Sequence, residues 1–274
     1  MGDWVIFELR DLRYGVRAEQ VTEMVILDQT VAIARAPATV RGLLNLRGRV
    51  LPVVDLRLRL GMPSAPQEVD DLCQLLLARE QDHVRWLDEL EACVRERREF
   101  KLALDPTKCA FGKWYYAYRP ENAVLRLQLA KLAEPHRRIH ETAGLVMKAL
   151  ADADPGRAQA TMASARLGTL ATLRRLLAET GEVIREQQRE IAVITGDGSR
   201  PWGLIVDAAI GVRSIRDDEI EPPRPGSLGA AEAFLTGFCQ LDGALTLLLD
   251  LPQLSPLATD GGEHVQPELP PPPA

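Results

Sequence analysis

The chain has 274 residues, of which 46% are hydrophobic and 26% are charged, as expected for a folded protein with substantial cores. Its net charge of -6 argues against a general nucleic-acid binder, which needs an excess of Lys and Arg to displace counterions from phosphates. The sequence begins without a basic segment followed by an apolar core, and no stretch approaches the roughly 20 apolar residues that span a bilayer. We therefore expect a cytoplasmic protein with no direct membrane insertion.

The four cysteines are irregularly spaced, which favours free thiols or metal ligands over a disulfide framework. They are Cys73, Cys93, Cys109 and Cys239.

The first region, from Trp4 to about Met62, alternates short β-rich runs with turn residues. Its predicted strands are VIFEL, VTEMVIL and VLPVVDLRLRL. In the last of these, leucines alternate with Arg57 and Arg59, which places leucines on one face and cations on the other. This pattern predicts a half-buried strand that continues to Leu60.

From about Val69 to Gln188 the hydrophobic period becomes that of helices packed in a bundle. One apolar stripe runs over residues 72–93, a second over 125–146 and a third over about 156–184. A Pro-Gly pair marks a turn before the third stripe. The pattern predicts three long helices, together with a short helical piece around Cys109.

The sequence again predicts β-strands at REIAVIT, WGLIVDAAIGV and ALTLLLDL, the last preceded by the hairpin dipeptide Asp242-Gly243. We infer that the helical block is inserted into one β-fold, which requires the chain to leave and return at nearby points. An even number of antiparallel helices meets this requirement. The predicted organisation is a β-domain formed by residues 1–64 and 189–258, an inserted helical domain at 65–188 and a disordered proline-rich tail at 259–274.

Three of the four histidines lie on the apolar stripes of the helical block. His136 and His140 are four residues apart and project from one helix face, while His83 lies on a stripe expected to face the same core. Any one of them alone fits a hydrogen-bonded core residue better than a ligand. Together with Cys109, however, they provide the nitrogen and thiolate ligands that fill a tetrahedral zinc site. We predict one zinc ion held by these four residues.

Residues around Cys109 suggest how such a site could respond to oxidants. Zinc keeps a cysteine as the nucleophilic thiolate, which can be oxidised and lose its hold on the metal. Release of Cys109 would free its turn, including Phe111 and Trp114, to rearrange against the bundle. Asp105 is either a carboxylate that tunes a ligand or, as we favour, a helix cap within LDPTK.

The β-rich segments resemble the CheW-like coupling proteins of bacterial chemotaxis. The N-terminal match comprises YG, VTEMV and RAPATVRGLLNLRGRVLPVVDLRLRLG, and the C-terminal match comprises WGLIVDAAIGVRSI and FLTGFCQLDGALTLLLDLPQLS. This resemblance implies an α+β multidomain chain whose β-part consists of two small, SH3-like, five-stranded barrels without a catalytic site.

The same resemblance implies a surface that meets the cytoplasmic tips of chemoreceptors, formed by Val21, Glu23, Gly42 and Arg47. The barrel groove would meet the regulatory domain of the CheA histidine kinase. A simpler interpretation remains open, in which Gly42 is only a turn residue and Arg47 a solvated cation.

The helical block resembles the chemoreceptor zinc-binding (CZB) domain, through HVRW, CAFGKW and PHRRIH. These motifs contain His83, Cys109, His136 and His140. The resemblance implies a four-helix bundle with a three-histidine, one-cysteine zinc site that senses zinc or oxidants such as hypochlorous acid.

Together these features predict a non-enzymatic chemotaxis adaptor with an inserted zinc-thiolate switch, and they leave open a homodimer formed through the insertion. Two alternatives also remain open: a constitutive adaptor with a purely structural zinc, and a zinc hydrolase. The hydrolase is disfavoured because Cys109 would fill the position that a catalytic water needs, and no H-E-x-x-H motif accompanies the histidine pair.

Overall fold

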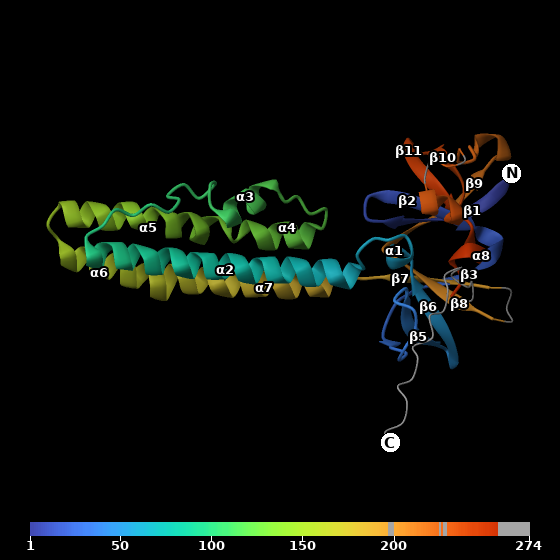
Figure 1. Ribbon diagram of the computed structural model, residues 1–274, viewed down its shortest axis with the longest axis horizontal. Helices are drawn as coiled ribbons and strands as arrows, with labels where there is room; N and C mark the ends of the chain where they lie inside the picture. The colour runs from blue at the N-terminus through green and yellow to red at the C-terminus, as the bar shows by residue number, and fades with distance from the viewer. Residues whose placement is uncertain (197–199, 225, 227–228, 257–274) are drawn as a thin grey trace, which may run out of the picture. The chain divides into compact units, whose positions relative to one another are not determined.

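The computed structural model describes residues 1–196, 200–224, 226 and 229–256, and the predicted proline-rich tail lies outside these ranges. The chain divides into two compact units (Figure 1). The β-unit is formed by residues 1–64 and the chain from Arg189 onward, and the helical unit by residues 65–188. The helical unit is therefore one continuous segment that interrupts the sequence of the β-unit.

The first sheet of the β-unit has the strand order β10-β11-β2-β1-β9. Strand β1 pairs antiparallel with both β2 and β9, whereas β11 pairs parallel with β2. The hairpin of β10 and β11 turns at Asp242-Gly243, both with positive φ, as predicted from the dipeptide. The strands are β1 (Gly2–Leu9), β2 (Leu12–Arg17), β9 (Ala208–Ile215), β10 (Leu235–Leu241) and β11 (Ala244–Leu249).

The second sheet has the order β3-β7-β8-β6-β5-β4. Strand β6, which precedes the helical unit in sequence, pairs parallel with β8, which follows it. Backbone pairing across the insertion thus unites the two parts of the β-unit. The strands are β3 (Val21–Ile26), β4 (Thr30–Val31), β5 (Val40–Leu46), β6 (Arg49–Asp55), β7 (Ile191–Thr195) and β8 (Trp202–Val206).

The resemblance implied two small five-stranded barrels. Two sheets are present, but the strand pairing does not close either one into a five-stranded barrel within the described ranges. The second sheet has six strands, with β3 and β4 at its edges. The register shifts between Val21 and Glu23 in β3 and between Val40 and Gly42 in β5. Such bulges bend a strand and locally interrupt its ladder.

Strand β1 is buried on both faces, which accounts for its nearly continuous apolar sequence. Val5 and Phe7 pack into one core cluster of the β-unit, whereas Trp4 and Ile6 pack into another. Its two faces therefore serve separate cores.

The predicted strand VLPVVDLRLRL is wrong beyond Asp55. Asp55 Oδ1 accepts a hydrogen bond from the Leu58 amide at 3.2 Å and caps a short helix, α1 (Leu56–Arg59). Arg57 is buried and donates to Asp207 from Nε at 2.8 Å and from Nη2 at 2.5 Å. The cation is therefore held inside the β-unit instead of facing water.

The helical unit contains the predicted stripes as helices, with two departures. The second stripe is divided between α4 and α5 near Lys131, and the third contains a π-helical turn between α6 and α7. The elements are α2 (Ala65–Glu96), α3 (Ala110–Ala117), α4 (Ala123–Ala130), α5 (Ala133–Ala151), α6 (Pro155–Ser164), the π-helical turn (Ala165–Leu170) and α7 (Ala171–Gln187).

The core of the helical unit is formed by the apolar stripes, and α2 and α7 lie side by side along it (Figure 1). Asp154 caps α6, and its side chain accepts a hydrogen bond from the Arg157 amide at 2.9 Å. In the part of the chain that the structure describes, no helix combines the length and apolar character required to cross a membrane.

Short helical segments complete the β-unit. They are the 3-10 helices Ala18–Gln20, Asp217–Glu219 and Gly229–Phe234, and the helix α8 (Leu251–Leu254).

Candidate metal centre

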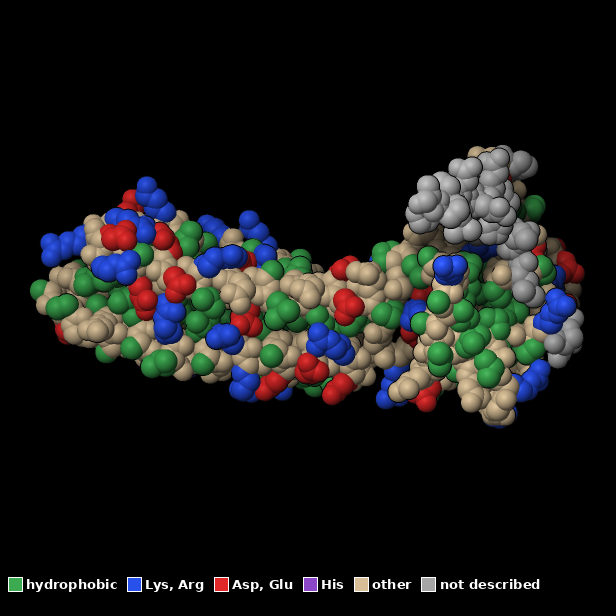
Figure 2. Space-filling model, turned by 60° about the horizontal axis from the view of Figure 1, so that its bottom comes forward, with side chains coloured by type: hydrophobic (Ala, Val, Ile, Leu, Met, Phe, Trp, Pro, Cys, Tyr) green, Lys and Arg blue, Asp and Glu red, His purple; other side chains and the backbone are tan. Residues whose placement is uncertain are grey.

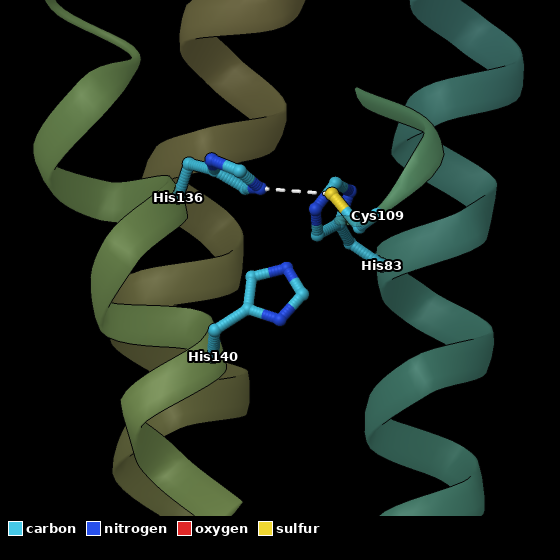
Figure 3. A group of neighbouring side chains, drawn as sticks. All are labelled: His83, Cys109, His136 and His140. Carbon is cyan, nitrogen blue, oxygen red and sulfur yellow. Dashed lines mark hydrogen bonds between the residues drawn. The ribbon is translucent and has the colours of Figure 1, made fainter. Parts of the chain in front are cut away.

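The structure brings the four predicted zinc ligands together from three separate elements. His83 lies on α2, His136 and His140 lie on α5, and Cys109 is the N-cap of α3. Their nitrogen and sulfur atoms all lie within 4.8 Å of one another, and the side chains converge (Figure 3).

Cys109 is positioned by the start of α3. Its sulfur accepts a hydrogen bond from the Gly112 amide at 3.1 Å, in the place of an N-cap oxygen. A Cβ on Gly112 would lie 1.8 Å from the carbonyl oxygen of Pro106, so only glycine allows this close approach. The glycine of the C-A-F-G motif therefore serves to bring the backbone around the sulfur.

Two backbone carbonyls orient the imidazoles of His83 and His140. His83 Nδ1 lies 2.6 Å from the Arg79 oxygen, and His140 Nδ1 lies 2.9 Å from the Ala103 oxygen. The carbonyls assign a proton to Nδ1 in each ring and leave Nε2 with a free lone pair. Both Nε2 atoms are buried, and neither has a hydrogen-bond partner within the described ranges.

His136 completes the set from the turn of α5 before His140. Its Nε2 lies 3.2 Å from the sulfur of Cys109 (Figure 3), while its buried Nδ1 has no hydrogen-bond partner among the described residues. The ring of Phe111 packs against it in an edge contact, with the ring centroids 4.6 Å apart. The centre is thus enclosed by aromatic as well as ligating side chains.

Burial controls the protonation of these groups. It is the largest cause of the lowered pKa of His83, and it lowers the pKa of His136 to about 3 and that of His140 to about 4. The three imidazoles are therefore neutral near pH 7, as metal ligands must be. Burial raises the pKa of the Cys109 thiol, against the opposing effect of the Gly112 and Phe111 amides.

These residues fit zinc. Zinc-ligand bonds of about 2.0–2.3 Å place the ligand atoms of a tetrahedron roughly 3.3–3.8 Å apart. The observed spacing of up to 4.8 Å needs only a small contraction to reach this geometry. Three imidazoles and a thiolate suit zinc, whereas calcium and magnesium prefer oxygen ligands.

A partly open cavity of about 420 Å³ borders the centre. Its lining includes Cys109, His83 and His140, as well as Asp82 and Trp86. A small molecule can therefore approach the sulfur from this side.

The three residues predicted around the switch have different surroundings. Phe111 is fully buried and contacts the rings of His83 and His136, whereas Trp114 contacts Phe111 and stacks on Tyr118. Asp105 Oδ1 accepts hydrogen bonds from the amide and hydroxyl of Thr107 at 2.9 and 2.8 Å. Asp105 therefore caps a turn and not a helix, because α3 begins at Ala110 with Cys109 as its N-cap. A role for any of the three residues in switching stays a prediction.

Sequence reasoning missed the carbonyls of Arg79 and Ala103, because a backbone acceptor leaves no signal in residue type. It also missed the role of Trp86, whose Nε1 donates to the Ala103 oxygen at 2.9 Å and whose ring contacts that of His140. The position of Trp86 three residues after His83, on the same helix stripe, could have indicated this role.

The four predicted partner-binding residues lie in the second sheet. Val21 and Glu23 are on β3, Gly42 is on β5 and Arg47 is in the turn between β5 and β6. Arg47 Nη2 lies 2.9 Å from Glu23 Oε2. Gly42 has a φ of +148°, and a Cβ there would lie 2.4 Å from the Val31 oxygen. The backbone at Gly42 therefore requires glycine, while the partner-binding role of these residues stays a prediction.

Comparison with protein families assigns the β-unit. The CheW-like domain matches residues 3–86 and 132–258, more than half of the chain. The chain belongs to the CheW-like family. The chemoreceptor zinc-binding domain matches residues 83–147, which contain the four clustered ligands. The protein is thus a CheW-like domain split by an inserted CZB domain.

Curated relatives share shorter segments with this CheW-like chain. The chemotaxis protein CheW of Klebsiella aerogenes is 37% identical over 57 residues, 21% of this chain and 34% of that protein. The probable chemotaxis protein CheW of Rhizobium etli is 38% identical over 61 residues, 22% of this chain and 39% of that protein. The chemotaxis protein CheW of Rhizobium meliloti is 38% identical over 65 residues, 24% of this chain and 42% of that protein.

The matched segments thus span between a third and about two fifths of the length of these relatives. Among solved structures, the scaffolding protein TtCheW from Thermoanaerobacter tengcongensis has a TM-score of 0.46 at 17% identity. That match covers 96% of this chain and 92% of TtCheW.

Proposed function

We propose that this protein is a cytoplasmic chemotaxis adaptor, without enzymatic activity, that couples chemoreceptor tips to the CheA histidine kinase under the control of an inserted zinc site. The observation that carries the proposal is the convergence of three histidines and one cysteine inside a CheW-like domain. The CheW-like fold supplies the contacts for coupling, and the insertion supplies the sensor.

The surface of the β-unit supports a role in binding other proteins. Several strand residues of the second sheet expose large apolar side chains, and Figure 2 shows hydrophobic side chains gathered on one face of this unit. Exposed apolar patches of this kind commonly mark protein-binding surfaces. The exposed residues are Met24, Ile26, Val31 and Val50.

We assign the receptor-binding face to the surface formed by Val21, Glu23, Gly42 and Arg47. For the kinase, a separate apolar cavity of about 390 Å³ offers a groove between the first sheet and the segment after α1. Its lining includes Tyr14, Met62 and Phe234. A groove lined by aromatic and aliphatic side chains suits an apolar segment of a partner domain.

The chemistry of the sensor rests on Cys109. Bound zinc would keep this cysteine as a thiolate, the form that reacts with oxidants. With hypochlorous acid, the thiolate gives a sulfenic acid and chloride, so that sulfur loses two electrons and chlorine gains them. The bordering cavity gives the oxidant access to the sulfur, and the three histidines remain to retain the ion.

Oxidation of Cys109 would also alter the local fold. The sulfur that accepts from the Gly112 amide at the N-cap of α3 would become part of a larger, neutral group and a weaker acceptor, next to Phe111, which packs on two ligand rings. Structural zinc sites contribute about 10–16 kcal/mol in small peptides, whereas inverting a two-state equilibrium takes about 5.5 kcal/mol. A change in one ligand is therefore energetically sufficient to drive a switch.

We further propose that the adaptor forms a homodimer through the helical insertion. Exposed apolar side chains on the helices support this, among them Leu127, Leu145 and Leu167. Light scattering of the full chain should then give twice the monomer mass, and the charged replacement Leu127→Glu should reduce it. A monomeric wild-type chain would contradict the dimer.

The experiment that tests the function reconstitutes the full chain with a chemoreceptor and CheA and measures kinase activity. We expect kinase control to differ between zinc-loaded, zinc-free and oxidised protein. In Cys109→Ser, oxidant should no longer alter kinase control, whereas the matched variant Cys93→Ser should behave like the wild type. Equal control in all three states would favour the alternative of a constitutive adaptor with a structural zinc.

A further inference from the structure

Strands β3 and β5 are not neighbours in the ladder of the second sheet, yet side-chain and backbone bonds join them at two places. At one place, the carboxylate of Glu190 accepts hydrogen bonds from Nη1 and Nη2 of Arg41 on β5, both at 3.1 Å. The Glu190 carbonyl accepts another from the Leu27 amide, directly after β3, at 2.8 Å. At the other place, Arg47 pairs with Glu23 at 2.9 Å. We refer to these five residues as the seam.

The seam lies close in sequence to the end of the helical insertion and contacts the last residue of the strand that precedes it. Glu190 lies three residues after Gln187, where α7 ends. Arg41 also pairs with Asp55, the last residue of β6 before α1 and the insertion. A single guanidinium therefore binds Glu190, which closely follows the insertion, and Asp55, which is separated from its start by α1 and residues 60–64.

The two ends of the seam differ in strength. Asp55 has 1% of its side chain exposed and Glu190 has 12%, so the ion pairs of Arg41 are shielded from water. Arg47 is 78% exposed, and pairs of this kind contribute little because water screens them and the long side chain must be ordered. The Glu190 end is thus firmly held, whereas the Glu23 end can open at low cost.

We propose that Glu190 and Arg41 couple the state of the helical insertion to the spacing of β3 and β5. A shift at the end of α7 displaces Glu190, which acts on β3 through its carbonyl and on β5 through its carboxylate. The displacement changes the weak contact between Glu23 and Arg47. Glu190 and Arg41 act here as positioning residues. The significance of this face for receptor binding rests on the proposed function, but the coupling itself is a property of the chain alone.

Hydrogen exchange of the full chain, read by mass spectrometry with zinc bound and after chelation, tests the proposal without receptor or kinase. In the wild type, zinc should change exchange in residues 21–27 and 40–50 by at least about threefold, as well as in the helical unit. Glu190→Gln keeps the size of the side chain and removes its charge. In this variant the change in 40–50 should disappear, while that in the helical unit persists. The exposed Glu186→Gln on α7 is the matched control and should respond like the wild type.

Arg41→Lys keeps the positive charge but cannot form the paired contact with Glu190, so it should also lose the response in 40–50. This variant breaks the same contact from the side of Arg41 while preserving its charge, so the proposal remains testable if Glu190→Gln does not fold. Unchanged exchange in the first sheet verifies that each variant is folded. The proposal is overturned if zinc leaves 21–27 and 40–50 unchanged in the wild type, or if both seam variants respond like it. Kinase control that ignores zinc, together with the expected exchange pattern, would instead refute the proposed function and leave the coupling intact.

Discussion

The buried ion pairs of the β-unit and the three buried imidazoles of the helical unit are satisfied in different ways. In the β-unit, Asp55 pairs with Arg41, and Arg57 pairs with Asp207, so the charges are neutralised by partners within the same unit. In the helical unit, His83, His136 and His140 each retain a buried nitrogen without a hydrogen-bond partner within the described ranges. Such groups cost free energy unless something binds them. These charges of the β-unit therefore find their partners within the chain, whereas the three imidazoles of the helical unit are arranged around an external ion.

Removing the metal should have the largest effect on stability, and this loss of stability should fall mainly on the helical unit. Chelation, or His136→Ala combined with Cys109→Ser, should abolish binding of one zinc per chain. Because a ligand at 1,000 times its Kd stabilises the folded state by about 4 kcal/mol, the helical unit should unfold at a clearly lower temperature. Metal analysis and calorimetry measure both effects. Cys93→Ser should keep its zinc, and a zinc-free helical unit of unchanged stability would remove the contrast between the two units.

Breaking a buried ion pair should have the next largest effect, on the other unit. Arg57→Ala leaves the Asp207 carboxylate without its bidentate partner and should destabilise the β-unit by about 3–5 kcal/mol. Urea unfolding measures the loss, and zinc content should not change. Arg213→Ala breaks the exposed pair with Asp242 and should cost less than about 1 kcal/mol. Equal losses of unfolding free energy in the two variants would show that burial does not make the Arg57–Asp207 pair more stabilising than the exposed pair.

Acid should weaken the zinc-free helical unit more than the β-unit. The folded-state pKa values of His136 and His140, about 3 and about 4, lie below the ordinary value of 6.5. Between the folded-state pKa values and 6.5, the unfolded chain binds more protons than the folded chain, so the stability of the folded state falls as the pH decreases. Stability should be greatest above about pH 6.5 and should be lost progressively toward pH 4. Thermal unfolding of chelated protein across this range tests the sign, and His136→Gln should reduce the slope. A helical unit that gains stability in acid would contradict the burial of neutral imidazoles.

The smallest effect on stability should come from Arg47→Ala. Its exposed pair with Glu23 should contribute less than about 1 kcal/mol to folding. If Arg47 belongs to the receptor-binding face, the same variant should nevertheless weaken capture by a chemoreceptor. Arg200→Ala, at an exposed position, provides a control for general loss of charge. A variant that binds the receptor normally would remove Arg47 from the proposed face.

The metal centre could be predicted from sequence because its ligands are scarce residue types at helical spacing. His136 and His140 share a face by periodicity alone, and Cys109 stands out in its aromatic turn. The partner atoms of Arg79 and Ala103 could not be predicted, since every residue carries a carbonyl and only the fold selects which ones face an imidazole. The same reason hid Glu190, an ordinary glutamate until strand pairing brings it to Arg41.

In the fold, the strands and helix stripes followed from hydrophobic period, but the end of β6 did not. The alternation of leucine and arginine after Asp55 fits a half-buried strand, yet the Asp55 cap begins a helix there and Asp207 provides a buried partner for Arg57. That partner lies 150 residues away in sequence, so local pattern could not reveal it. Asp55 is a residue type that commonly caps helices, but the alternation of leucine and arginine favoured a strand more strongly.

X-ray absorption at the zinc edge, before and after one equivalent of hypochlorous acid, tests the central claim most directly. The resting protein should show three nitrogen ligands and one sulfur ligand at about 2.3 Å, and oxidation should remove the sulfur contribution while zinc stays bound. Cys109→Ser should lack the sulfur contribution from the start. A resting spectrum without sulfur, or one that oxidation leaves unchanged, would contradict a zinc site in which Cys109 is the ligand that switches.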